Sequence, residues 1–189
     1  ILSVLGYKQD TPWTNEEVQS LYDANINEIR IDEVGSVIDE LDKNENLSYT
    51  IYQSSENNKV TGYAIPIAGK GLWGTMYGYF AIEPDAETVK GITFYKHKET
   101  PGLGAEVDKD WFKNNFVGKK LTNKNGELVS IEVIKGYVSD TDPDAPHKVD
   151  GISGATITGT GLTTFLKSDL QKYEPYFAKV RSVNQIESL

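Results

Sequence analysis

The spacing of apolar residues changes twice along the chain, and this limits the possible folds more than any single motif does. Between residues 47 and 97 the sequence follows the two-residue period of strands with one buried face. Before and after this stretch, apolar residues recur every three or four positions, the spacing of amphipathic helices. Strands in the middle of a chain with helices at both ends indicate an α+β fold. We therefore expect a twisted, mainly antiparallel β-sheet flanked by N- and C-terminal helices.

Four strands are expected in the middle of the chain, at residues 47–53, 59–68, 75–83 and 88–97. The polar residues 54–58 indicate a hairpin turn between the first two strands. A short helix is expected around residues 110–116 and another strand at 128–138. The last helix is expected from about residue 160 to residue 173.

The N-terminal part is expected to be helical. Thr14 and Glu17 have the spacing of a capping box, which predicts a helix that begins near Thr14. Its apolar face would consist of Val18, Leu21, Tyr22, Ile26 and Ile29. Residues 30–46 suit a second helix that Gly35 interrupts. Because no repeat or linker divides the chain, we expect one domain over residues 1–189, with an N-terminal helical region (1–45) and a core (46–175).

Composition narrows the possible functions. The 189 residues include 19 Lys and Arg against 28 Asp and Glu, a formal net charge of −9, so no basic face for nucleic acid is expected. The absence of cysteine excludes disulfides, thiolate catalysis, iron–sulfur clusters and zinc–thiolate sites. No uncharged apolar run reaches the ~18 residues that span a bilayer. Because the chain begins at Ile1 and not at Met, we expect a signal peptide or membrane helix upstream.

Residues 69–74, Gly-Lys-Gly-Leu-Trp-Gly, match the G-x-G-x-x-G pattern of dinucleotide-binding folds. In those folds the pattern opens a helix, whereas the residues that follow here are strand-like. The segment is therefore expected to be a hairpin connection. Leu72 and Trp73 would then be exposed apolar side chains that could border a ligand.

Residues 140–144, Asp-Thr-Asp-Pro-Asp, resemble the start of a calcium-binding loop. Ala145 stands where that loop needs glycine, and Gly151 where it needs glutamate, which excludes an EF-hand. A solvated acidic loop is the main interpretation, and a looser surface cation site is the alternative.

Residues 151–155, Gly-Ile-Ser-Gly-Ala, are similar to a nucleophile elbow, but the fifth residue is not glycine. A serine hydrolase also needs a base, and His97 and His147 both lie in hydrophilic stretches. A hydrolase is therefore disfavoured.

The small residues between Ser153 and Thr158 lead directly into the last helix. Small side chains let backbone amides approach a ligand, and a helix N-terminus adds unpaired donors and about half a positive charge. This combination favours a phosphate group. The alternative is a tight turn with Thr158 or Thr160 as the N-cap of the helix.

Residues 100–104, Thr-Pro-Gly-Leu-Gly, form a second informative loop. Proline stiffens it and the two glycines allow unusual dihedral angles. Leu103 and backbone amides could cover a flat ring, with Glu99 and Thr100 as polar contacts. The alternative is an ordinary turn with a buried leucine.

Both loops resemble motifs of the FMN-binding domain family. Residues 150–156, Asp-Gly-Ile-Ser-Gly-Ala-Thr, resemble its D-x-x-[ST]-G-A-T motif, in which the phosphate of FMN is esterified to the threonine. Residues 97–104 are similar to the H-x-E-T-P-G-L-G stretch of the same proteins. The resemblance implies a covalent FMN on Thr156, with Thr158 as the rival acceptor.

The resemblance also implies roles for the neighbouring residues. Asp150 would be recognised during modification, and the phosphate would be cradled by Ser153, Gly154 and Ala155. The isoalloxazine ring would be bordered by Glu99, Thr100, Gly102 and Leu103.

Within the family, residues 71–73 and 111–120 resemble subunits of sodium-translocating NADH:quinone oxidoreductases, with the Rnf complexes as the alternative. The resemblance implies an electron-carrier subunit of such a reductase, with other subunits of a membrane redox complex as partners. It implies a flavin transferase for maturation and an upstream helix in the inner (cytoplasmic) membrane, with this domain on the extracytoplasmic side. A non-redox module that binds a phosphorylated small ligand is the alternative from another class.

Overall fold

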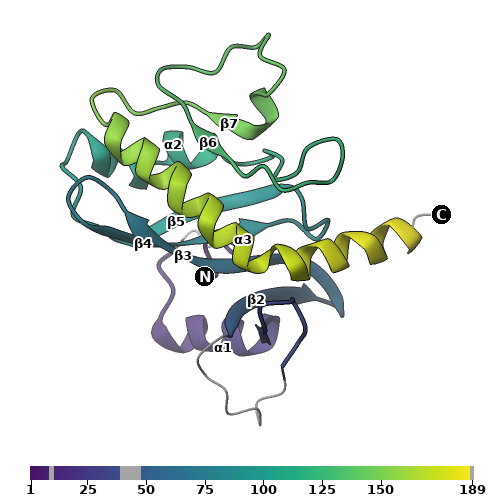
Figure 1. Cartoon of the computed structure of the whole chain (residues 1–189). Coiled ribbons are helices and arrows are strands. Elements are labelled where there is room, and N and C mark those ends of the chain that lie inside the picture. The colour runs from purple at the N-terminus through teal and green to yellow at the C-terminus, as the bar shows by residue number, and fades with distance from the viewer. Residues whose placement is uncertain (9–10, 39–47, 188–189) are drawn as a thin grey trace.

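The computed structural model describes residues 1–8, 11–38 and 48–187, and its centre is one antiparallel sheet (Figure 1). The strands follow one another in chain order: β1 (Ile26–Ile31), β2 (Tyr49–Glu56), β3 (Lys59–Lys70), β4 (Thr75–Ile82) and β5 (Val89–Lys96). Two short strands, β6 (Glu132–Val133) and β7 (Lys148–Val149), pair in parallel. The helices are α1 (Asn15–Asn25), α2 (Asp110–Asn114) and α3 (Thr156–Glu187). The expected α+β fold is confirmed.

Helix α1 begins as predicted but ends earlier. The Thr14 amide donates to the Glu17 carboxylate (2.8 Å) and the Glu17 amide donates to the Thr14 hydroxyl (3.2 Å), which completes the capping box. The predicted apolar face is wrong, because α1 buries no residue and Ile26 and Ile29 belong to β1. Pairing of β1 with β2 outweighs the helical spacing, so residues 1–45 are only partly helical.

The predicted second helix is absent from residues 30–38. The Asp32 carboxylate accepts hydrogen bonds from the amides of Val34 (3.0 Å) and Ser36 (2.7 Å), which closes a turn. Gly35 has a φ of +71° in this turn. The rest of the predicted helix, from residue 39 to 46, lies outside the described residues.

The two central hairpins are confirmed. The turn between β2 and β3 is shorter than predicted, because Asn57 and Asn58 both have positive φ (51° and 63°) and form a two-residue turn. The strand predicted at 128–138 is wrong except at β6. Positive φ at Ser130 (70°) and Gly136 (89°) interrupts the extended backbone on both sides of β6.

Helix α3 covers one face of the sheet and closes the main core (Figure 1). It begins four residues before the predicted start and continues to Glu187. Pro175 lies inside α3, and Figure 1 shows the bend partway along it; proline lacks the amide that would continue the hydrogen-bond ladder. Side chains of α3 and of the sheet share the main core, among them Leu162, Leu166, Ile65, Ile67 and Phe80.

A smaller apolar cluster contains Val4 and Leu5 of the N-terminal segment with Ala64 of β3 and Ala81 of β4. None of the helices among the described residues is both long and apolar enough to cross a bilayer.

Candidate functional site

The two loops that the sequence singled out meet at the N-terminus of α3. A Cβ atom on Gly154 would lie 2.8 Å from Leu103 Cδ2, and Gly154 has a φ of +74°. Only glycine fits this position without strain, because both the space and the left-handed backbone exclude a side chain. Residues 100–104 and 150–156 therefore form one site, although about fifty residues separate them in the chain.

Glu99 lies beneath this site and is only 5% exposed. Its Oε2 accepts a hydrogen bond from the Thr158 hydroxyl (2.5 Å), and its Oε1 accepts one from the Trp73 amide (3.0 Å). A Cβ atom on Gly71 would lie 2.6 Å from Oε1, and one on Gly104 2.5 Å from Oε2. The carboxylate thus faces the protein and joins the β3–β4 turn, the 100–104 loop and the first turn of α3.

The three hydroxyls at the start of α3 have different surroundings. Thr158 is fully buried and its hydroxyl is bound to Glu99. Thr156 is the first residue of α3 and is exposed. Thr160 is also exposed, and its hydroxyl donates to the Thr156 carbonyl (3.0 Å). Because the helix begins at Thr156, the alternative in which Thr158 or Thr160 is the N-cap is wrong.

The start of α3 fits a phosphate ester. The first bond into the helix runs from the Gly159 amide to the Ala155 carbonyl (3.1 Å), so the amides of residues 156–158 have no partner within the helix. The first turn contains no acidic residue. Unpaired amides and the helix dipole both favour an anion here.

Two hollows flank Thr156, which lines both together with Thr160. One has a volume of about 450 Å³ and lies against residues 132–137 and 151–156. The other has a volume of about 550 Å³ and is also lined by Lys70, Leu72 and Phe165. A group attached to Thr156 therefore has room on either side of α3.

The remaining predicted residues support the two loops. Asp150 accepts a hydrogen bond from the Val138 amide (2.7 Å), which ties residues 136–138 to the site. Ser153 is exposed and Ala155 is buried. The exposed Thr100 closes its own loop, because its carbonyl accepts the Leu103 amide (3.1 Å). The exposed Gly102 has a φ of +72° within that loop.

Apolar side chains lie exposed around the site. Leu72 and Trp73 are 41% and 64% exposed, as expected for a hairpin connection. The Gly71 amide donates to the Gly74 carbonyl (2.8 Å) and β4 starts at Thr75, which confirms that residues 69–74 are a hairpin turn. Leu103 is half-exposed, so it is not the buried leucine of an ordinary turn.

Sequence reasoning missed Ile157, which is 62% exposed beside Thr156. Its position gave a signal, since it falls outside the apolar side of the last helix, where Leu162, Leu166 and Leu170 are buried. An exposed isoleucine next to the acceptor position adds to the apolar border of the site.

Two other motifs do not join the site. In the acidic loop, Lys148 Nζ lies 2.9 Å from Asp142 Oδ2 and 3.6 Å from Asp144 Oδ2. The hydrogen bond from Lys148 lowers the pKa of Asp142 below its ordinary value. Within residues 1–8, 11–38 and 48–187, no three acidic or histidine side chains are grouped as they would be for a metal ion. This argues against the surface cation site.

The histidines that a hydrolase would need are engaged elsewhere. His97 Nε2 lies 2.7 Å from Asp108 Oδ2, and His147 Nδ1 lies 2.7 Å from the Lys120 carbonyl. Neither forms a hydrogen bond with Ser153 in the described part of the chain.

Residues 71–171 match the sequence model of the FMN-binding domain, and this match covers more than half of the chain. The chain therefore belongs to the FMN-binding domain family, which confirms the resemblance seen in its motifs.

Curated relatives are named as one particular member, the NqrC subunit of the Na⁺-translocating NADH-quinone reductase. The protein of this name from Pseudomonas aeruginosa is 40% identical over 134 residues, which are 70% of this chain and 51% of that protein. The one from Haemophilus ducreyi is 42% identical over 129 residues, which are 67% of this chain and 48% of that protein. This chain thus spans about half the length of these relatives.

Two crystal structures have the same fold. The NqrC subunit of the reductase from Parabacteroides distasonis has a TM-score of 0.74 and 31% identity, over 89% of this chain and 86% of that chain. NqrC from Shewanella oneidensis has a TM-score of 0.80 over 96% of this chain and 94% of that one; at 24% identity it supports the fold alone.

Proposed function

We propose that this chain is an electron carrier that holds FMN covalently on Thr156 and acts within the NqrC subunit of a Na⁺-translocating NADH:quinone reductase. Membership of the FMN-binding domain family and the names of the curated relatives support the cofactor and the complex. The observation that carries the attachment site is the contrast between Thr156, exposed at the start of α3, and Thr158, buried and bound to Glu99.

The attachment is a phosphoryl transfer. A bond forms between Thr156 Oγ1 and the phosphorus of an activated FMN donor, the bond from phosphorus to the donor's leaving group breaks, and the hydroxyl proton is lost. We infer that a flavin transferase catalyses this step. The resulting diester keeps one negative charge, which the amides at the start of α3 stabilise.

FMN, when bound, supplies the electron-transfer chemistry, and the protein supplies its position and surroundings. Leu72, Leu103 and Ile157 offer apolar surface to a ring next to Thr156. Simple electron transfer needs no general acid or base at the site, which agrees with the engagement of both histidines elsewhere.

We infer that a helix upstream of this chain anchors the protein in the inner membrane, with this domain on the extracytoplasmic side. Its partners would be the other subunits of the reductase. The support is the identity of the relatives, of which this chain spans about half.

The test is co-expression of the exported chain with a flavin transferase, followed by intact-mass measurement. We expect an increase equal to the mass of FMN less one water, and flavin fluorescence that survives denaturing electrophoresis. Thr156→Ala should lose both signals. Thr160→Ala, which removes the other exposed hydroxyl in the first turns of α3, should keep them.

An unmodified mass would contradict the proposal, provided that the same transferase labels a known FMN-binding domain in the same cells. Flavin that is bound by the folded chain but released on denaturation would favour the non-covalent alternative. Labelling that survives in Thr156→Ala would move the attachment to another residue.

A further inference from the structure

Lysines gather beside the candidate site although the whole chain is acidic. Three stretches meet there: residues 69–77, 93–98 and 156–168, none of which contains Asp or Glu. Glu99 follows the second stretch, but its carboxylate is buried. With a net charge of −9 over the chain, the site thus lies in a region of opposite local charge.

Three of these lysines, Lys70, Lys96 and Lys98, are exposed at the hairpin end of the sheet and form no ion pair with any described residue. This distinguishes them from other lysines of the chain. Ion pairs with carboxylates engage Lys90, Lys113, Lys120, Lys148 and Lys172.

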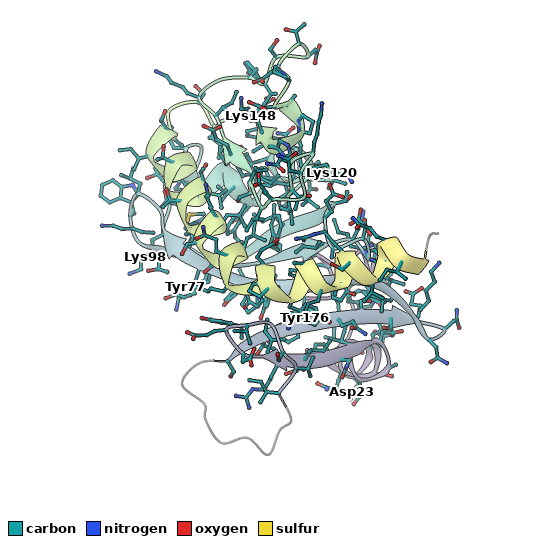
Figure 2. All side chains as sticks on the ribbon, turned by 45° about the vertical axis from the view of Figure 1, so that its right-hand side comes forward. Asp23, Tyr77, Lys98, Lys120, Lys148 and Tyr176 are labelled. Atoms are coloured by element: carbon teal, nitrogen blue, oxygen red, sulfur yellow. The ribbon has the colours of Figure 1, made fainter. Side chains whose placement is uncertain are left out.

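The exposed lysines and the site belong to one surface. Lys98 Cδ lies 3.7 Å from where a Cβ on Gly74 would lie, and Lys70 lines the 550 Å³ hollow together with Thr156. Lys96 Nζ lies 5.5 Å from the centre of the Tyr77 ring. Figure 2 shows Lys98 and Tyr77 on the same side of the molecule.

Exposed aromatic and aliphatic side chains lie among these lysines. Trp73 is 64% exposed and Tyr95 62% exposed, and Leu72 lies next to Trp73. Tryptophan and tyrosine are frequent anchors of protein interfaces, and lysines around them would favour a partner of opposite charge. We call this surface the basic tip; it consists of Lys70, Leu72, Trp73, Tyr95, Lys96 and Lys98.

We propose that the basic tip docks the acidic face of the redox protein that exchanges electrons with the ring held at Thr156; this inference rests on the proposed function. An electron carrier must bring its cofactor close to that of its partner, and interfaces of this kind are small and short-lived. The positive field of the basic tip attracts an acidic partner, while the acidic remainder of the chain repels it from unproductive faces. A lipid surface would accept the same lysines but offers no electron acceptor.

The first test measures the local charge with two small oxidants. The reduced holoprotein is mixed with hexacyanoferrate(III), a trianion, or hexaammineruthenium(III), a trication. Two oxidant ions accept one electron each per ring, whose protons pass to the buffer. We expect the trianion rate constant to fall about tenfold in Lys96→Glu/Lys98→Glu and the trication rate constant to rise. High salt should reduce both effects.

The matched control is Lys59→Glu/Lys124→Glu, which changes the net charge equally at two exposed lysines in other turns. It should leave both rate constants nearly unchanged. Equal effects of the two double variants would overturn the inference, because only the net charge would then matter. Absence of flavin from the wild-type protein would instead contradict the proposed function.

The second test uses the full-length chain in the assembled reductase. Lys96→Glu/Lys98→Glu should slow quinone reduction about tenfold at low salt and weaken its salt dependence, whereas the control pair should not. Unchanged turnover, or lysine-dependent binding of the domain to phosphatidylglycerol vesicles with turnover unaffected, would overturn docking to a protein.

Discussion

The carboxylate of Glu99 connects three segments that are far apart in the chain. The Trp73 amide and the Thr158 hydroxyl both donate to it, and no side chain fits between it and Gly71 or Gly104. Since a buried donor without a partner is costly, this residue holds the first turn of α3, and with it Thr156, against the rest of the site.

Replacement of Glu99 should therefore destabilise the fold more than replacement of an exposed glutamate does. Glu99→Ala should lower the free energy of unfolding by about 1–3 kcal/mol, because two buried donors lose their acceptor. Glu99→Gln should cost less, since the amide oxygen can still accept from Trp73. Urea unfolding measures both. Glu132→Ala, at an exposed carboxylate, is the control, and an equal loss there would contradict this role.

Sequence reasoning identified the residues of the site but not the direction in which each one faces. The order of small residues located the start of a helix near Thr156. That Glu99 turns inward to Thr158, 59 residues away, depends on the packing of α3 against the sheet, and no local pattern records that packing. Ile157 was missed for a similar reason, because its exposure depends on which side of α3 meets the sheet.

At the scale of elements, α3 is held by close backbone approaches. A Cβ on Gly69 would lie 2.0 Å from Phe165 Cβ, and one on Gly161 would lie 2.2 Å from the Lys70 carbonyl oxygen. The glycine pattern of residues 69–74 therefore serves packing of the hairpin against α3 and Glu99. Asp169 adds a polar link, since its carboxylate accepts the Ala68 amide of β3 (2.8 Å).

The bend of α3 is packed in the same way against the turn at Gly35. A Cβ on Gly35 would lie 2.3 Å from the Tyr176 amide nitrogen and 2.5 Å from the Pro175 carbonyl carbon. Gly35→Ala should therefore destabilise the fold both by backbone strain and by separating the turn from α3. Gly126→Ala isolates the strain, because Gly126 also has positive φ (79°) but nothing lies within 4 Å of its added Cβ.

Thermal or urea unfolding should show a loss of about 1–2 kcal/mol for Gly126→Ala from strain alone. The loss for Gly35→Ala should exceed it by about 1–3 kcal/mol, the usual cost of overpacking. Similar losses for the two variants would mean that the contact with Pro175 and Tyr176 does not stabilise the fold.

Elements with strict alternation or a clear cap could be predicted from the sequence. The capping box at Thr14 and the hairpins of β2–β5 depend on neighbouring residues alone. The end of α1 could not be predicted, because Ile26 and Ile29 suit a helix locally and pairing with β2 draws them into a strand. The short β6 was overestimated because Ser130 has an unexpected positive φ.

For the whole molecule, alkaline pH should weaken the core through Tyr63. Burial, with a smaller effect of Tyr176, raises the pKa of Tyr63 from its ordinary value of 10.0 to about 12. The folded state therefore keeps this proton where the unfolded state loses it. The resulting stabilisation is complete below pH 10.0 and is lost as the pH rises to about 12.

Urea unfolding at a series of pH values checks this expectation. The free energy of unfolding should fall above pH 10.0, and Tyr63→Phe, which removes the ionisable hydroxyl, should make the fall shallower. Part of the fall should remain, because burial also raises the pKa of Tyr173 and Tyr176. An identical slope in wild type and variant would show that Tyr63 is not the group responsible.

The function of the whole molecule depends on what is attached at the start of α3. Tandem mass spectrometry of peptides from the full-length protein, purified within its own membrane complex, tests this most directly. We expect the peptide that contains residues 153–160 to carry the mass of FMN less one water, with fragment ions that assign it to Thr156. An unmodified peptide from a complex that reduces quinone, or an adduct on any other residue, would contradict covalent attachment at Thr156.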